Sequence, residues 1–235
     1  MPTIIPARPL LALLLLGFLL AGCGNAAPPS SPETPTRAAP TSTPAAAQVG
    51  IVVLGDSLAA GLGLAEDEAF PAVVEERLRA AGHDVEVVNA GVSGDTSAGG
   101  LRRIDWLLRQ EPDLVVVELG ANDALRGQPV ESTENNLRRI IRRSRDAGAR
   151  VVLTGMDVPT NYGADYAGAF ADMYERLAAD EGVVLVPGFV REIGFDPDLM
   201  QPDGLHPTAE GQRRLAERLL PALEEELGKL ERSPN

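Results

Sequence analysis

Five short apolar runs, rich in valine and leucine, alternate with longer amphipathic stretches and constrain the fold more than any other feature of the sequence. Continuous apolar runs without polar alternation are typical of strands that are covered on both faces. The runs lie at residues 49–54, 85–89, 114–119, 150–154 and 183–187. The other stretches predict helices at residues 70–81, 97–109, 131–147, 164–180 and 208–227. This alternation predicts one α/β domain in which helices cover both faces of a parallel sheet.

Ser57 stands directly beyond the first predicted strand, in the segment GDSL at residues 55–58. Ligands of open parallel sheets bind beyond the carboxyl ends of the strands, so this serine lies where an active site is expected. A serine at such a place can also simply cap a helix. A nucleophilic serine needs a base, which at neutral pH is usually histidine, and the chain has 2 histidines.

His206 is the better candidate for this base, because it lies in a loop between the fifth predicted strand and the last predicted helix. Asp203 precedes it in the same loop and can orient the imidazole ring, although an aspartate there also suits a plain turn. His83 instead leads into the second predicted strand at its amino end, away from Ser57. We expect His83 to be a solvated loop residue.

Two further polar loops follow predicted strands and contain Gly94 and Asn122. An enzyme that transfers acyl groups needs hydrogen-bond donors for the oxygen that becomes negative, and a backbone N–H with an amide side chain can supply them. The alternative is that both loops are ordinary turns with Asn and Asp as capping residues. All these polar segments are predicted to meet at one edge of the sheet.

Four segments, taken together and in order, resemble blocks I, II, III and V of the SGNH (GDSL) hydrolases. They are GDSL at 55–58, SGDT with Gly94, GAND with Asn122 and DGLHP with Asp203 and His206. The resemblance covers residues 49–227 and is greatest to the bacterial arylesterase, lysophospholipase and acyl-CoA thioesterase branch. The sequence departs from many members at Ala121, where a glycine is usual.

The resemblance implies a three-layer α/β/α sandwich on a five-stranded parallel sheet, similar to flavodoxin. It implies that Ser57 is the nucleophile, that His206 is the base and acid, and that Asp203 orients the histidine. The implied oxyanion hole is formed by the N–H groups of Ser57 and Gly94 and the side-chain amide of Asn122. The resemblance implies no metal and no cofactor.

The segment at residues 156–168 follows the fourth predicted strand and is expected to overhang this site. It resembles a segment that shapes the acyl pocket in the same branch. Ordinary loop packing explains its apolar residues equally well. The candidate pocket residues are Leu58, Leu125, Met156, Val158, Pro159 and Tyr162.

The N-terminal region contains an apolar run at residues 10–22, preceded by Arg8 and followed by Cys23, the only cysteine. A membrane-spanning helix needs about 20 apolar residues, so this run predicts an export signal instead. Residues 20–23, Leu-Ala-Gly-Cys, resemble the lipobox of bacterial lipoproteins, in which the cysteine is lipidated. An ordinary cleaved signal and a short uncleaved anchor are the alternatives.

These features divide the chain into four expected parts. They are a lipoprotein signal peptide at residues 1–22, a flexible Pro/Ala/Ser/Thr-rich tether at 23–47, the hydrolase domain at 48–230 and a disordered tail at 231–235. We therefore expect an exported, monomeric protein held to a membrane through Cys23 and facing the periplasm or the cell exterior.

The expected activity is hydrolysis of acyl esters through an acyl-enzyme, on small acyl-ester or lysolipid substrates. The alternatives are a deacetylase of acetylated polysaccharides with the same triad and an inactive lipid-binding lipoprotein. The acidic excess, 34 Asp and Glu against 21 Lys and Arg with a net charge of -13, argues against nucleic-acid binding.

Overall fold

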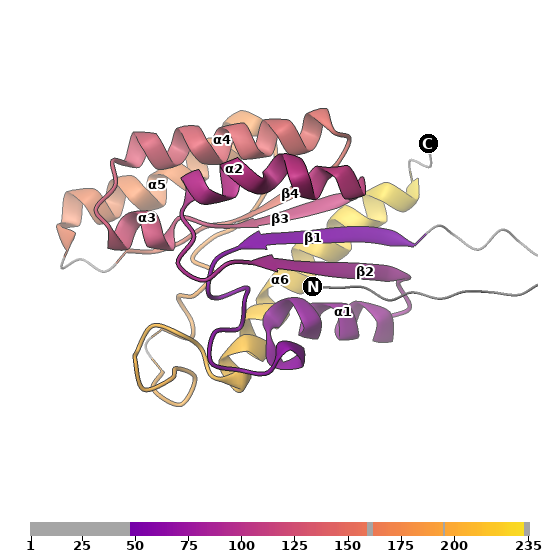
Figure 1. Cartoon of the computed structure of the whole chain (residues 1–235), viewed down its shortest axis with the longest axis horizontal. Helices are drawn as coiled ribbons and strands as arrows, with labels where there is room; N and C mark the ends of the chain where they lie inside the picture. Colours follow the sequence, from indigo (N-terminus) through magenta and orange to yellow (C-terminus); the bar gives the residue numbers. More distant parts are fainter. Residues whose placement is uncertain (1–47, 159–161, 195, 233–235) are drawn as a thin grey trace, which may run out of the picture. The chain divides into compact units, whose positions relative to one another are not determined.

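All five strands of the central sheet are parallel and run in the order β2-β1-β3-β4-β5 (Figure 1). This computed structural model describes residues 48–158, 162–194 and 196–232. The predicted signal peptide, Cys23, the tether and Pro159 lie outside these residues. The strands are β1 (Val49–Gly55), β2 (Val85–Gly91), β3 (Leu114–Glu118), β4 (Arg150–Thr154) and β5 (Val184–Val186).

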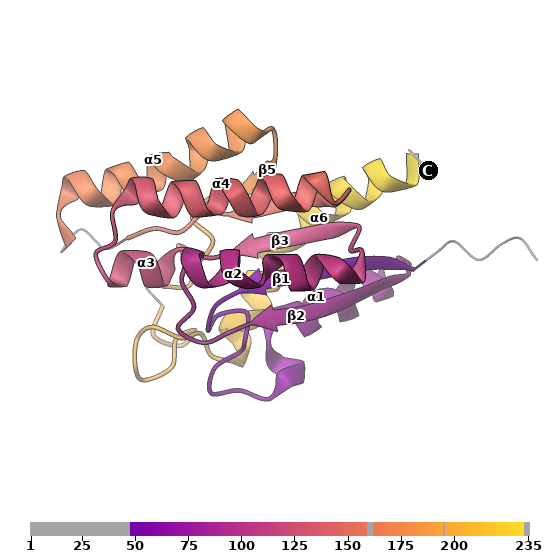
Figure 2. The same ribbon diagram turned by 45° about the horizontal axis from the view of Figure 1, so that its top comes forward.

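Helices cover both faces of the sheet and complete three layers (Figures 1 and 2). Helices α1 and α6 pack together on one face, while α2, α4 and α5 form the layer on the other face. The helices are α1 (Phe70–Ala80), α2 (Ser97–Leu107), α3 (Ala121–Leu125), α4 (Val130–Asp146), α5 (Ala164–Glu181) and α6 (Ala209–Arg232), with 3-10 turns η1 (Glu66–Glu68) and η2 (Leu108–Gln110). The predicted α/β/α sandwich on a five-stranded parallel sheet is confirmed.

The central strands β1, β3 and β4 are largely buried, as their apolar runs predicted, whereas the edge strands β2 and β5 are mostly half-buried. All five residues of β3 are buried, as are the last five residues of β1. Both strands therefore contribute side chains to the apolar layers above and below the sheet.

The structure differs from the sequence prediction in its short elements and at its C-terminal end. Helix α3 was not predicted, because five residues are too few to show a helical period. Helix α6 continues to Arg232, beyond the predicted helix end at 227 and the domain end at 230. The expected disordered tail is therefore wrong for residues 231–232, and residues 233–235 lie outside the described part.

The strand register aligns the carboxyl ends of β1, β2 and β3, so the loops that follow these strands begin side by side at one edge of the sheet. Gly55 at the end of β1 pairs with Gly91 on β2 and with Glu118 on β3. The chain moves from β1 to β2 on one side and then returns to β3 on the other side, which makes the end of β1 a topological switch point. No helix within the described ranges is long and apolar enough to cross a membrane.

Candidate active site

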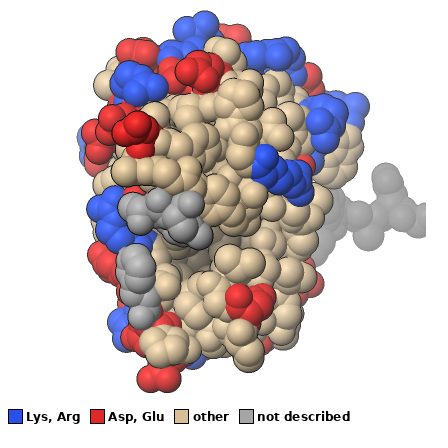
Figure 3. All heavy atoms as spheres, turned by 90° about the vertical axis from the view of Figure 1, so that its left-hand side faces the viewer, with Lys and Arg blue, Asp and Glu red and all other residues tan. Residues whose placement is uncertain are grey.

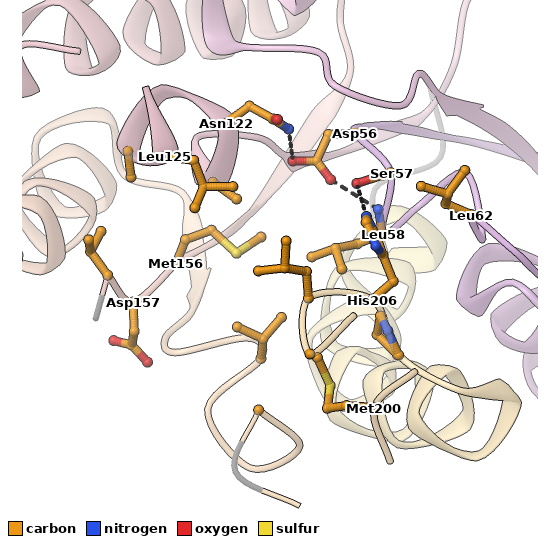
Figure 4. Close-up of a pocket in the computed structure, with 18 of the residues that line it drawn as sticks. Asp56, Ser57, Leu58, Leu62, Asn122, Leu125, Met156, Asp157, Met200 and His206 are labelled. Atoms are coloured by element: carbon orange, nitrogen blue, oxygen red, sulfur yellow. Dashed lines mark hydrogen bonds between the residues drawn. The ribbon is translucent and has the colours of Figure 1, made fainter. Parts of the chain in front are cut away.

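Ser57, His206 and Asp203 form a continuous chain of hydrogen bonds at the carboxyl edge of the sheet. The Nε2 atom of His206 lies 3.0 Å from the Oγ atom of Ser57 (Figure 4). Its Nδ1 atom lies 2.6 Å from Oδ2 of Asp203. A histidine in this position can accept the serine proton while the carboxylate stabilises the charged ring. The structure therefore brings the predicted nucleophile Ser57 next to His206 and Asp203, which come from one distant segment of the sequence.

The Asp203 carboxylate is fixed by its own loop as well as by the histidine. Its Oδ1 atom accepts the backbone N–H groups of Leu205 and His206 at 2.9 and 3.0 Å. The hydrogen bond from His206, followed by those two backbone bonds, lowers the pKa of Asp203 to about 2. Asp203 is therefore a carboxylate throughout the neutral pH range, and its turn already points it at Nδ1.

Ser57 lies in a tight turn that begins where β1 ends. The N–H of Leu58 donates to Oδ1 of Asp56 at 3.0 Å, which closes the turn around the serine. Gly55 is required just before it, since a Cβ atom there would lie 2.5 Å from both Ala59 Cβ and Glu118 Oε2. Helix α1 does not begin until Phe70, so helix capping does not explain the serine.

Two glutamines that were not selected from the sequence hold the serine turn, Gln201 from the histidine loop and Gln212 from helix α6. Gln201 Nε2 donates to the carbonyl oxygens of Leu62 and Pro207, at 2.7 and 2.9 Å. The buried Gln212 side chain donates to the carbonyl of Leu58 at 3.0 Å. The only sequence signal for Gln212 is a polar residue on the buried face of the last helix.

The proposed oxyanion-hole residues Gly94 and Asn122 line the same cavity as Ser57. Gly94 has a φ of 79°, a conformation that favours glycine, and its carbonyl accepts a hydrogen bond from Arg126 at 2.8 Å. The Asn122 side-chain amide donates to Oδ2 of Asp56 at 3.0 Å, which leaves its second N–H for another acceptor (Figure 4). Residues from the three loops that follow β1, β2 and β3 therefore line one cavity beside the serine.

Two buried carboxyl groups lie beneath this turn. Burial raises the pKa of Asp56 to about 6, although its bonds from Leu58 and Asn122 act in the opposite direction. Glu118 is completely buried, and burial raises its pKa well above the ordinary value. The N–H of Asp56 donates to Glu118 Oε2 at 3.2 Å, whereas Oε1 has no partner among the described atoms. Glu118 therefore supports the turn through its hydrogen bond with Asp56, in a site where burial disfavours the charged carboxylate. In the sequence it is marked only as a lone carboxyl group in an apolar run.

Arg103 connects the ends of β1 and β2 with the loop that follows β2. Its guanidinium donates to the carbonyl oxygens of Gly55 and Ala90, at 2.8 and 2.5 Å, and forms an ion pair with Asp95 at 2.8 Å. The charge of Asp95 therefore helps to hold Arg103, and with it the end of β1, in place.

A cavity of about 720 Å³ opens beside Ser57 and is lined mainly by apolar side chains (Figure 4). Of the predicted pocket residues, Leu58, Leu125, Met156 and Val158 line it. Tyr162 does not belong to its lining and has 39% of its surface exposed, because it lies farther along the loop, just before α5. Within the described ranges no three His, Cys, Asp or Glu side chains are grouped to hold a metal ion.

The far wall of the cavity comes from the segment between β5 and α6 and was not predicted as a wall. It includes Val190, Arg191, Met200, Leu205 and Pro207. Leu205 and Pro207 flank the predicted base His206, but residues 190–200 have no regular periodicity and no motif that marks them as part of a pocket.

Comparison with known proteins identifies related chains over most of the described domain. The profile of the GDSL-like Lipase/Acylhydrolase family matches residues 53–214. The chain is 46% identical over 180 residues to Esterase TesA of Pseudomonas aeruginosa, covering 76% of this chain and 89% of the relative. It is 41% identical over 174 residues to Thioesterase 1/protease 1/lysophospholipase L1 of Escherichia coli K12, covering 74% and 82%.

The described fold also matches solved structures. A crystal structure of TesA superposes with a TM-score of 0.73 at 44% sequence identity, covering 76% of this chain and 99% of that chain. Nearly the whole of that relative therefore corresponds to the domain described above.

Proposed function

Since this chain belongs to the GDSL-like lipase/acylhydrolase family and is a serine ester hydrolase, we propose that it cleaves single-acyl esters through an acyl-enzyme on Ser57. The observation that carries the proposal is the relay from Ser57 through His206 to Asp203 at the mouth of an apolar cavity. A nucleophile, a base and a fixed carboxylate are the groups that ester hydrolysis requires.

In the proposed mechanism, Ser57 Oγ attacks the ester carbonyl while His206 Nε2 takes its proton. The tetrahedral intermediate collapses when the imidazolium gives that proton to the leaving alcohol, and the acyl group stays on Ser57. Water then attacks the acyl-enzyme with His206 again as base, releasing the carboxylic acid and restoring the serine. Asp203 stabilises the imidazolium in both halves of the reaction.

We assign the oxyanion hole to the N–H groups of Ser57 and Gly94 and the side-chain amide of Asn122. Asp56 supports this assignment, because its hydrogen bond with Asn122 holds the amide in one orientation before substrate binds. Donors held in advance lower the barrier more than donors that must reorient during the reaction.

The cavity favours an apolar acyl chain as the bound group. Its walls include Leu58, Met156 and Val158, which provide burial for methylene groups but few partners for sugar hydroxyls. The names of the relatives, esterase and thioesterase/lysophospholipase, favour the same class of substrate. An acetyl-sugar substrate would leave most of this apolar wall unused.

We expect the rate of hydrolysis to depend on acyl length. For p-nitrophenyl esters, kcat/KM should rise about tenfold or more from acetyl to octanoyl, because each buried methylene contributes about 0.8 kcal/mol. Lysophosphatidylcholine and an acetylated xylan should be assayed in parallel. A flat length profile with rapid deacetylation of the xylan would contradict the proposed substrate class.

We also propose that the enzyme is an exported lipoprotein, with a signal peptide at residues 1–22, lipid on Cys23 and a tether from 23 to 47. The apolar run, the position of the single cysteine and the proline-rich composition support this proposal. Replacement of Cys23 with serine should prevent lipid attachment and move the protein from the membrane fraction to the soluble fraction. Membrane retention of the Cys23→Ser chain would indicate an uncleaved apolar anchor instead.

A further inference from the structure

Exposed large apolar side chains are concentrated at the end of the domain that contains the active site. Among the described residues, six large hydrophobic side chains have exposed fractions from 39% to 60%. Five of them occur one in each of the five connections that follow β1 to β5. We call this set the apolar rim: Leu62, Val92, Leu125, Tyr162 and Leu205.

The apolar rim is continuous with the cavity. Leu62, Leu125 and Leu205 line the cavity as well as being exposed, and Val92 adjoins the lining residue Ser93. Figure 3 views this end of the molecule and shows a hollow whose described surroundings are mainly uncharged, with one acidic group beside it and most other charged side chains toward the margins. A chain that enters the cavity therefore passes between exposed apolar side chains.

Several charges at this end are already satisfied by partners within the domain. Arg191 forms two hydrogen bonds of 2.8 Å with the Asp157 carboxylate, and Asp203 is bound to His206. Arg126 donates to the carbonyl of Gly94. Removal of water from this end would leave these groups paired, so its cost is smaller than that of desolvating unpaired charges.

We propose that the apolar rim is a docking surface for a zwitterionic phospholipid bilayer, from which a monoacyl substrate enters the cavity directly. The inference rests on the proposed function, since it concerns how that substrate reaches Ser57. A lipid bilayer is a suitable partner for the apolar rim because the rim consists of separate side chains around an opening. Each of these side chains can enter the bilayer interface between head groups. The net charge of -13 makes a zwitterionic surface a better partner than an anionic one.

The length of chain before the domain is compatible with this orientation. Gln48 lies at the amino end of β1, the end of the sheet opposite to the rim (Figure 1). The 26 residues from Cys23 to Gln48 reach up to about 80 Å in an extended polyproline conformation. The seven residues of β1 span only about 23 Å, so a chain attached at Cys23 is long enough to let the far end of the domain face the same membrane.

The test measures binding of residues 24–235 to phosphatidylcholine vesicles by co-sedimentation. This form omits the lipid anchor, and the TesA crystal structure, 99% of which matches the domain, supports its independent folding. Val92→Asp and Leu205→Asp should each weaken vesicle binding about tenfold, because a charge replaces an inserted apolar group. Trp106→Asp is the matched control, since Trp106 is 60% exposed but lies near the C-terminal end of α2, away from the rim.

Two further measurements separate docking from catalysis. Ser57→Ala should bind vesicles like the unaltered chain, and Val92→Asp should keep its activity on soluble p-nitrophenyl butyrate and its melting temperature. Vesicle binding without any esterase activity would contradict the proposed function but not the docking surface. The docking proposal is overturned if the unaltered chain does not bind, if Trp106→Asp weakens binding equally, or if the rim variants change only a dimer equilibrium.

Discussion

Replacement of Ser57 with alanine is expected to lower kcat for ester hydrolysis by about 10⁶ and to leave the fold intact. The Oγ atom is the attacking group, and no other hydroxyl takes its place in the bond of 3.0 Å to His206 among the described residues. The alanine variant loses one hydrogen bond at the cavity surface, so its melting temperature should change little. Turnover of p-nitrophenyl butyrate by the purified enzyme measures the effect.

Ser93 provides a matched control for this experiment, because it lines the same cavity in the loop after β2. Ser93→Ala should retain activity within a few-fold of the unaltered enzyme. Full activity of Ser57→Ala, or an equal loss in Ser93→Ala, would show that the nucleophile has been assigned wrongly.

Replacement of Asp203 with asparagine should lower kcat by about 10⁴ through a change in the histidine tautomer. The asparagine oxygen can still accept the N–H groups of Leu205 and His206, so the turn is retained. Its NH₂ group, however, faces Nδ1 of His206 in place of Oδ2 and donates to it. The ring proton then resides on Nε2, where it prevents His206 from accepting the Ser57 proton.

The control for Asp203→Asn is Asp198→Asn, an exposed aspartate of the same segment that accepts no bond from His206 in the described structure. It should leave kcat unchanged. Kinetics between pH 6 and 9 should show the Asp203→Asn loss throughout, since the pKa of Asp203 is about 2 and the carboxylate is charged over this whole range. A loss confined to one end of the range would contradict the tautomer explanation.

The pKa of Asp203 also has a consequence for stability. Its folded pKa is lowered from 3.8, so its contribution to stability is complete above about pH 4 and is lost as the pH falls toward 2. Unfolding followed by circular dichroism should show a smaller decrease between pH 4 and 2 for Asp203→Asn than for the unaltered enzyme.

The α/β fold and the reactive groups were predictable because both depend on local patterns. A strand covered on both faces must be apolar throughout, which made the five runs visible without any knowledge of their neighbours. Ser57, Gly94, Asn122 and His206 could be selected because each occupies a short polar segment at the end of an apolar run or before a helix.

The supports of the site were not predictable in this way. Glu118 looked like one residue of an apolar strand, and Gln212 like one residue of an amphipathic helix. Glu118 is important because it contacts Asp56, which is 62 positions away in the sequence. Gln212 is important because it contacts Leu58, which is 154 positions away. Such contacts follow from the packing of the sheet and helices and leave no periodic signal.

The sequence by itself determined the alternation of strands and helices and the chemical groups at the strand ends, because burial and turn formation act over a few residues. Only the tertiary structure decided that Ser57 and His206, 149 positions apart, approach to 3.0 Å. It also decided that loops after all five strands surround one apolar cavity. The physical reason is that strand register and helix packing set these distances, and both depend on contacts between segments far apart in the chain.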